Sequence, residues 1–372
     1  MKKNFKCLAL MAAALLMGFS SCSNDDDNAG SNDNGPKKTI SLTMAKTYTE
    51  GAVQKEGDVT FTSGDVYFTD DQGVIRRHLS ISKDAGTTTN INMDTFMKEG
   101  KTVTDLPSSV NHVYMVGNTP KLPTSGNISA VLKMALGVKS QADLAGANLY
   151  GDAVTKKVSD ATPTDNAKYT AEITLKPTVS RVELTDMTIT GNVITGYKIA
   201  GIFIDNYYAA ANVDGTTTST AVNNGADSAP FADNTTEYPS DLSKCIYDWY
   251  TTPLAATSNV AKPSLKDGVW GYNLFAGNAV PRIVIRLTGV TADPKSGMED
   301  QYKNDQFITI RAINVAGVPL TSIEAGKIYN IAAGALSFDE SYVTPTPNQK
   351  LIDVTVTVKL ATWTVVDSKP VL

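Results

Sequence analysis

Cysteine, histidine and charge are scarce in this sequence. Its 372 residues include three cysteines and two histidines, and charged residues make up only 19% of the chain. The net charge is −5, which argues against a nucleic-acid partner because nucleic acid binds basic patches. The two histidines, His78 and His112, lack neighbours at metal-ligand spacing, so we expect neither a metal nor a cofactor. Without a Gly-x-Ser-x-Gly motif or a phosphate-binding glycine-rich loop, we also expect no enzyme.

Long hydrophobic runs are also missing. The one apolar stretch, residues 7–19, is shorter than the roughly 20 residues that a membrane-spanning helix needs. It follows three lysines within the first six residues and ends at two serines and Cys22. A basic start, a short apolar region and small residues at its end are typical of a secretory signal peptide, predicted here for residues 1–21.

The residues at the end of this signal resemble the lipobox of bacterial lipoproteins. In that family the chain is cut before the cysteine and lipid is attached to its sulfur, so the resemblance implies lipidation of Cys22. Phe19 departs from the usual leucine, and ordinary secretion with an incidental cysteine is the alternative. Residues 22–38 are polar and acidic with almost no apolar side chains, which predicts a flexible tether.

Beyond the tether, short segments of alternating polarity dominate. In the segment 39–45, Ile40, Leu42 and Met44 share one face while serine and threonine occupy the other. Similar runs rich in Thr, Val, Ile and Tyr, bounded by Gly, Asp and Asn, recur along the chain and predict β-strands. The Asp70–Gly73 sequence could suggest calcium, but it lacks the further ligands of a calcium loop and predicts a hairpin turn.

Two segments have helical spacing. From Asn127 as N-cap, apolar residues recur at i, i+3, i+4, i+7 and i+8 up to Leu136, and Gly137 follows, which predicts a helix. A shorter helical turn is expected at 93–97. Between Tyr208 and Val269 the sequence is rich in Thr, Asn, Ala, Ser, Asp and Pro, and we expect a surface excursion with little regular structure.

Many short strands separated by turns favour β-sandwiches over a parallel sheet. We therefore predict a mostly-β protein with two sandwich domains, residues 39–177 and 178–372, the first of which carries a helix. Pro177, near the middle of the chain, marks the expected border. Lone Cys245 is expected to be a small buried hydrophobe rather than a reactive thiol.

Several segments together resemble the fimbrillin family, the subunits of type V pili in Bacteroidetes. They are Leu175–Leu184, Gly196–Ile204, the Gly-Lys-x-Tyr-x-Ile stretch 326–331, the closing Val-x-Val-x-Val stretch that ends at Trp363, and the segment 113–118 with the helix after it. The resemblance implies two transthyretin-like sandwich domains in tandem. It also implies a lipid-anchored outer-membrane precursor that becomes part of a cell-surface pilus.

In that family a protease cuts behind the first strand, this strand leaves, and a donor strand from the carboxy terminus of a neighbouring subunit replaces it. Here the resemblance assigns the displaced strand to Ile40, Leu42 and Met44. It assigns the donor strand to the terminal segment, whose apolar face consists of Val354, Val356, Val358 and Leu360 before Trp363. The alternative is that both strands belong only to their own domains.

The family's protease commonly requires arginine, yet no arginine precedes Arg76. Lys55 and Lys46 are therefore the candidate cleavage sites, and Lys55 is preferred because it lies in a loop-like Glu-Gly-rich context. Cutting at Arg76 would remove further strands.

The function expected from this resemblance is that of a structural pilus subunit that supports adhesion, as a homopolymer or with other pilus subunits. Whether it forms the stalk, anchor or tip is open. The alternative is a non-polymerising surface lipoprotein that binds glycans or another host ligand. For that alternative, the candidate patch is the aromatic cluster Tyr247, Trp249 and Tyr250, for which structural packing is the competing explanation.

Overall fold

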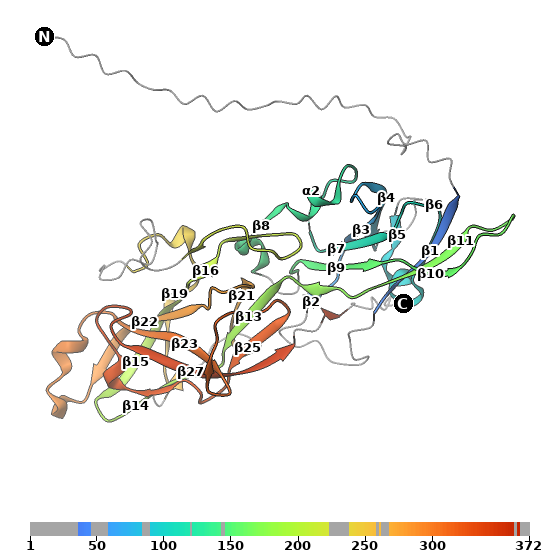
Figure 1. Ribbon diagram of the computed structural model, residues 1–372. Coiled ribbons are helices and arrows are strands. Elements are labelled where there is room, and N and C mark those ends of the chain that lie inside the picture. Colours follow the sequence, from blue (N-terminus) through green and yellow to red (C-terminus); the bar gives the residue numbers. More distant parts are fainter. Residues whose placement is uncertain are drawn as a thin grey trace, which may run out of the picture. The chain divides into compact units, whose positions relative to one another are not determined.

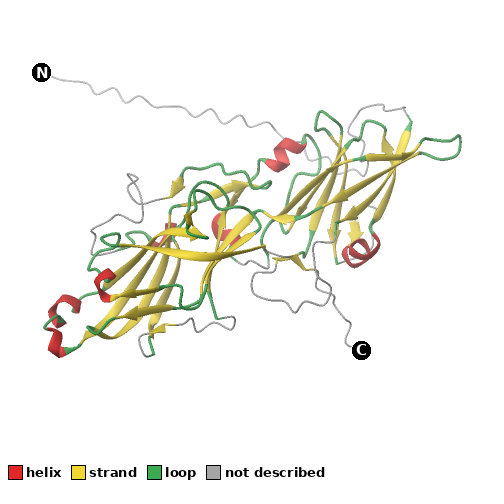
Figure 2. Ribbon diagram, turned by 60° about the horizontal axis from the view of Figure 1, so that its bottom comes forward, coloured by secondary structure: helices red, strands yellow, loops and turns green. Residues whose placement is uncertain are grey.

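The computed structural model describes residues 36–45, 59–83, 90–119, 121–142, 146–222, 238–257, 260–261, 268–360 and 363–364. Strands dominate these residues, as Figure 2 shows in yellow, so the prediction of a mostly-β protein is confirmed. No helix within these ranges is long and apolar enough to cross a membrane.

Strands from the first part of the chain form two sheets. A four-stranded sheet has the order β10 (Lys156–Ser159), β11 (Ala167–Ile173), β1 (Lys37–Met44) and β6 (Lys101–Pro107). A six-stranded sheet has the order β12 (Lys176–Pro177), β9 (Leu149–Val154), β7 (His112–Gly117), β3 (Gly64–Thr69), β4 (Ile75–Ser82) and β5 (Asn90–Asn92).

The later strands form one large sheet. Its nine strands follow the order β19 (Ile246–Ala255), β15 (Ile194–Asp205), β22 (Arg282–Ala292), β23 (Gln306–Val315), β27 (Leu351–Leu360), β25 (Lys327–Ile331), β13 (Val179–Leu184) and β21 (Trp270–Phe275), with β24 (Val318–Pro319) on β23. β13 is buried at every position. Two of its buried residues are charged, and the Arg181 guanidinium donates a hydrogen bond to the Glu183 carboxylate at 2.8 Å.

Smaller ladders complete the strand pairing. They are β20 (Val260–Ala261) with β14 (Met187–Thr190) and β26 (Ser337–Asp339), β16 (Tyr207–Tyr208) with β18 (Ala221–Val222), β17 (Ala210–Asn212) with β8 (Ala135–Gly137), and β2 (Val59–Thr60) with β28 (Trp363–Thr364). The last pair joins segments from opposite ends of the sequence.

Helices are few and short in the described residues. The α-helices are α1 (Met93–Glu99) and α2 (Ile128–Leu132), and the 3-10 turns are η1 (Val138–Gln141), η2 (Leu242–Lys244), η3 (Pro294–Ser296), η4 (Glu299–Tyr302) and η5 (Glu340–Tyr342). The predicted turn at 93–97 is confirmed as α1, whose N-cap Asn92 accepts a hydrogen bond from the amide of Thr95.

Two local expectations were wrong. The helix from Asn127 ends at Leu132, because Leu136 instead pairs with Ala211 in the β8–β17 ladder. The stretch between Tyr208 and Val269 contains a ten-residue strand, β19, which forms the edge of the large sheet. In both cases a partner distant in sequence determines the local structure.

The predicted domain border at residues 177 and 178 stays a prediction. The four- and six-stranded sheets use strands up to Pro177, and the nine-stranded sheet begins at Val179. Asn148 links the two series, since its side-chain amide donates to the Thr178 hydroxyl at 2.9 Å and to the Val213 carbonyl at 2.7 Å.

Candidate functional site

The first strand, β1, lies inside its sheet rather than at an edge. It pairs in parallel with β11 on one side and antiparallel with β6 on the other, and Figure 1 shows it in dark blue beside β11. The parallel register continues from Lys38 opposite Ala167 to Met44 opposite Ile173. We call the space between β6 and β11 the β1 slot. Removing β1 would expose the hydrogen-bonding groups of two strands at once.

The inward face of β1 is part of the hydrophobic core. Ile40 and Leu42 are fully buried, and Met44 is partly buried against the same cluster. The expected period of two in this strand is therefore present in its burial pattern. Burying two such side chains contributes about 3–6 kcal/mol, an upper figure based on roughly 1.5–3 kcal/mol for each.

Gly100, which follows α1, closes one side of this slot. Its φ is +74°, and a Cβ there would lie 2.5 Å from the carbonyl oxygen of Leu42. Only glycine combines this backbone conformation with such a close approach. The chain after α1 therefore fits directly against the backbone of β1.

Sequence reasoning missed Lys38, which continues the inward face of β1 by two positions. Its side chain is only 3% exposed. The ammonium group donates to the carbonyl oxygen of Val110 and, at 3.0 Å, to the side-chain oxygen of Asn111. The period of two, extended backwards from Ile40, was the signal that could have identified it.

The terminal strand β27 also has two neighbours. It pairs in parallel with β23 and antiparallel with β25, which is the same combination of directions that surrounds β1. Val354 and Val356 are buried at 2% and 4% exposure, whereas Val358 is 37% exposed. The strand thus stays paired in its own sheet to Leu360, but burial of its described side chains ends at Val356. For Leu360 and Trp363 the structure describes the backbone pairing and not the side chains.

Cys22, Lys46 and Lys55 lie outside the described residues. Their predicted roles in lipidation and cleavage stay predictions. Arg76 lies within strand β4, where its guanidinium contacts the carboxylate of Asp70 at 2.6 Å. A paired arginine inside a hairpin strand is a poor protease site, in line with the preference for a lysine before β2.

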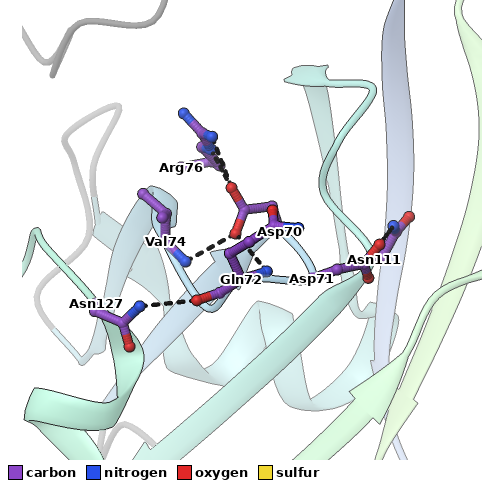
Figure 3. Close-up of polar contacts among 7 residues, drawn as sticks. All are labelled: Asp70, Asp71, Gln72, Val74, Arg76, Asn111 and Asn127. Atoms are coloured by element: carbon purple, nitrogen blue, oxygen red, sulfur yellow. Dashed lines mark hydrogen bonds and ion pairs between the residues drawn. The ribbon is translucent and has the colours of Figure 1, made fainter.

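The β3–β4 hairpin confirms the turn predicted at 70–73 (Figure 3). Asp70 accepts hydrogen bonds from the amides of Gln72 and Val74 at 3.0 and 2.8 Å. Burial alone would raise the pKa of Asp70, but these bonds and Arg76 together hold it below its usual value. No group of three metal-ligating side chains occurs in the part of the chain that the structure describes.

The aromatic cluster divides between the two faces of strand β19. Tyr247 and Trp249 are 39% and 42% exposed and both pack on Phe203. Tyr250 instead accepts a hydrogen bond from the indole of Trp270 at 2.7 Å, so it has a structural role. Two of the three predicted patch residues therefore share a surface, and Arg286 lies over the Trp249 ring at 5.2 Å.

A cleft of about 380 Å³ opens beside Tyr247. Asp248 lines it and accepts a hydrogen bond from the Tyr272 hydroxyl at 2.7 Å. Burial raises the pKa of Asp248, and the bond from Tyr272 opposes this shift. Cys245 lines the cleft too and is buried, as expected, and burial raises the pKa of its thiol to about 12. Its low reactivity stays a prediction.

No protein-family model matches the sequence. No curated protein matches it either. Among solved structures, a proposed cell adhesion protein from Bacteroides eggerthii matches with a TM-score of 0.55 and 14% identity, over 91% of this chain and 100% of that chain. A fimbrilin, FimA from Porphyromonas gingivalis, matches with a TM-score of 0.55 and 12% identity, over 90% and 99% of the two chains. This chain therefore has the fimbrilin fold, and the resemblance seen in the sequence is confirmed at the level of fold.

Proposed function

We propose that this chain is a structural subunit of a cell-surface pilus and a member of the fimbrillin family, with two transthyretin-like domains. It is exported as a lipoprotein anchored through Cys22 to the outer membrane. Cleavage behind β1 triggers donor-strand exchange, and the resulting polymer, of this chain or with other pilus subunits, supports adhesion. It has no enzymatic activity.

The observation that carries this proposal is the position of β1. A strand with neighbours on both sides and a buried apolar face leaves a complete strand-binding groove when it departs. Main-chain hydrogen bonds from β6 and β11 would supply affinity for the incoming strand. The pockets that Ile40 and Leu42 vacate would bind every second side chain of that strand and so provide specificity. The segment 46–58, which contains both candidate lysines, directly follows β1 and precedes β2.

Gel electrophoresis tests the proposal. Full-length protein treated with a trypsin-like protease should form heat-stable ladders in SDS, and untreated protein should stay monomeric. A double variant with Lys46→Gln and Lys55→Gln should form no ladder, while Lys83→Gln, the control, should behave like the wild type. If protease-treated wild type remains monomeric under all conditions, polymerisation by strand exchange is wrong.

The exposed pair Tyr247 and Trp249 favours a second candidate, a non-polymerising lipoprotein that binds glycans. Tyr247 lines the cleft together with the carboxylate of Asp248, and Trp249 is exposed two residues further along the same strand. Aromatic rings are suited to stack on sugars, and a carboxylate is suited to bind their hydroxyls. Glycan-array binding that is lost in Trp249→Ala, but kept in the exposed control Val318→Ala, would support this function. An absence of ladders together with such binding would favour it over the pilus.

A further inference from the structure

A buried lysine begins the inward face of β1. Besides its bonds to Val110 and Asn111, the Lys38 ammonium lies 4.3 Å from the centre of the Tyr169 ring. One carbonyl oxygen, one amide oxygen and one aromatic face thus surround the cation. We call these three groups, which belong to β11 and to the residues just before β7, the cation socket.

A second layer of polar groups supports the socket. The Asn111 amide nitrogen donates to the Asp71 carboxylate at 2.9 Å, as Figure 3 shows. This bond orients the Asn111 oxygen towards Lys38. The His112 ring nitrogen also lies 3.3 Å from Asp71. Burial lowers the pKa of Lys38, while the nearby Asp71 charge raises it. The β3–β4 hairpin therefore helps to position a site for a positive charge.

The cation socket can fix the register of β1, which is its alignment with the neighbouring strands β6 and β11. In a strand whose face alternates, a slip of one residue turns the apolar side chains outwards, but a slip of two residues keeps them inwards. Ile40, Leu42 and Met44 therefore exclude odd slips only. A buried lysine with matched acceptors excludes the even ones, because in a slipped strand an apolar side chain would face unpaired buried oxygens.

We propose that the cation socket binds the ammonium group of whichever strand fills the β1 slot and fixes its register. We further propose that after exchange this group is Lys359 of a second copy of the chain. The second part rests on the proposed pilus function, whereas the first concerns β1 in the intact protein.

The sequence near the carboxy terminus has the same spacing of a lysine and apolar residues as β1. Lys38 is followed at steps of two by Ile40, Leu42 and Met44, and Lys359 is followed at steps of two by Ala361, Trp363 and Val365. Both series run in the same chain direction, so the incoming strand would lie parallel to β11 as β1 does.

A similar spacing begins at Lys350. Its followers Ile352, Val354 and Val356, however, are buried in the sheet between β23 and β25. The side chain of Lys359 is exposed, and its backbone pairs with Ile328 of β25, whereas the described pairing with β23 ends at Val356. The donor strand that we propose therefore begins at Lys359. Its inward side chains stand at odd-numbered positions, whereas the face first expected for Val354–Leu360 consists of even-numbered positions.

Release of the first strand tests the socket. A specific protease site is inserted in the segment 46–58 of the full-length chain, and a fluorophore is attached near Ser23. After cleavage, the release rate is measured at increasing urea, so that every variant gives a rate. Lys38→Met should accelerate release at least tenfold, which corresponds to about 1.4 kcal/mol. Lys38→Arg should stay within threefold of the wild type.

The control is Thr43→Met, which introduces the same side chain at an exposed position on the other face of β1. It should alter release less than threefold. If Lys38→Met and Thr43→Met release the strand at the same rate, the socket does not hold β1 and the inference is wrong. This result does not depend on whether subunits polymerise.

Peptide binding to the emptied slot tests the occupant. A peptide of residues 357–367 should bind at least tenfold more tightly than the same peptide with Lys359→Met. Equal binding of the two, or no binding of either while the first-strand peptide 37–45 rebinds, would overturn the role of Lys359. The pilus function would fail separately, by the absence of ladders in the wild type.

Discussion

Ser41 of β1 lies directly opposite Thr102 of β6, and their hydroxyl oxygens are 3.4 Å apart. Both residues are on the face of the strand opposite to Ile40 and Leu42. Side chains that face each other across an antiparallel pair are close enough for a disulfide when both are cysteine. This pair therefore allows β1 to be locked in its slot without disturbing the core.

The packing of β1 predicts an unequal response to truncation of apolar side chains. Leu42→Ala should lower the free energy of unfolding by about 2–5 kcal/mol, because a fully buried leucine leaves a cavity. Val358→Ala, at a 37% exposed position, should cost less than about 1 kcal/mol. Urea unfolding of both variants measures the difference. Equal costs would contradict the placement of β1 in the core.

The β3–β4 turn predicts a pH-dependent loss of stability. Asp70→Asn should cost about 1–3 kcal/mol at neutral pH, because the charged acceptor of two amides and Arg76 is lost. The folded pKa of Asp70 lies below 3.8, so its contribution is complete above about pH 4 and is lost as the pH falls through the folded pKa. Unfolding from pH 7 to pH 2 should show the variant converging on the wild type. A constant difference across this range would contradict the assignment.

The buried tyrosines predict that the protein also loses stability at alkaline pH. Burial raises the pKa of Tyr67, Tyr150, Tyr197 and Tyr207 above the usual value of 10.0. Above pH 10 these residues ionise in the unfolded chain and not in the folded one, so the unfolded state binds fewer protons. Stability should then fall by up to about 1.4 kcal/mol per pH unit for each tyrosine.

Denaturant unfolding between pH 8 and pH 11 measures this fall, and tyrosinate absorbance of the folded protein checks its cause. Tyr67→Phe is the matched variant, since the Tyr67 hydroxyl is buried without a hydrogen-bond partner among the described residues. It should reduce the slope above pH 10 without loss of stability at pH 7. Normal titration of all tyrosines near pH 10 would overturn the prediction.

Two truncations distinguish the part of the terminal segment that stabilises the large sheet from the part that we propose as the donor strand. Deleting residues 361–372 removes the two-residue ladder between β28 and β2, so it should lower the unfolding midpoint only slightly, and it should abolish SDS-stable ladders. Deleting from Val354 onwards should unfold the large sheet, because β27 lies between β23 and β25. Circular dichroism measures the unfolding of both variants, and SDS gels show whether ladders form. Ladders from the shorter truncation would show that residues after Leu360 are not the donor.

The sequence was informative where structure is set locally. The alternation at Ile40 and Leu42 and the Asp70 turn needed only a few neighbouring residues to be recognised. In contrast, β19 lies in a stretch whose composition is typical of loops. It forms a strand because it pairs along the edge of the long strand β15. Helix α2 stops early because β8 pairs with a strand about 75 residues away. Such non-local pairings leave little trace in local periodicity.

The candidate site shows the same limit. The apolar positions of β1 could be predicted from their spacing, but its two neighbouring strands could not. The period of two that runs back from Ile40 places Lys38 on the inward face of β1, although it stands at the end of a polar segment. The groups that accept its charge, on Val110, Asn111 and Tyr169, come from distant parts of the sequence and could not be predicted from it.

The central claim, that β1 must leave its slot before subunits polymerise, is tested most directly by the Ser41→Cys and Thr102→Cys double variant. Protease-treated protein should form no SDS-stable ladder while the disulfide is intact, and it should form ladders as the wild type does after reduction. Ladders of equal yield in the oxidised and reduced states would contradict the account.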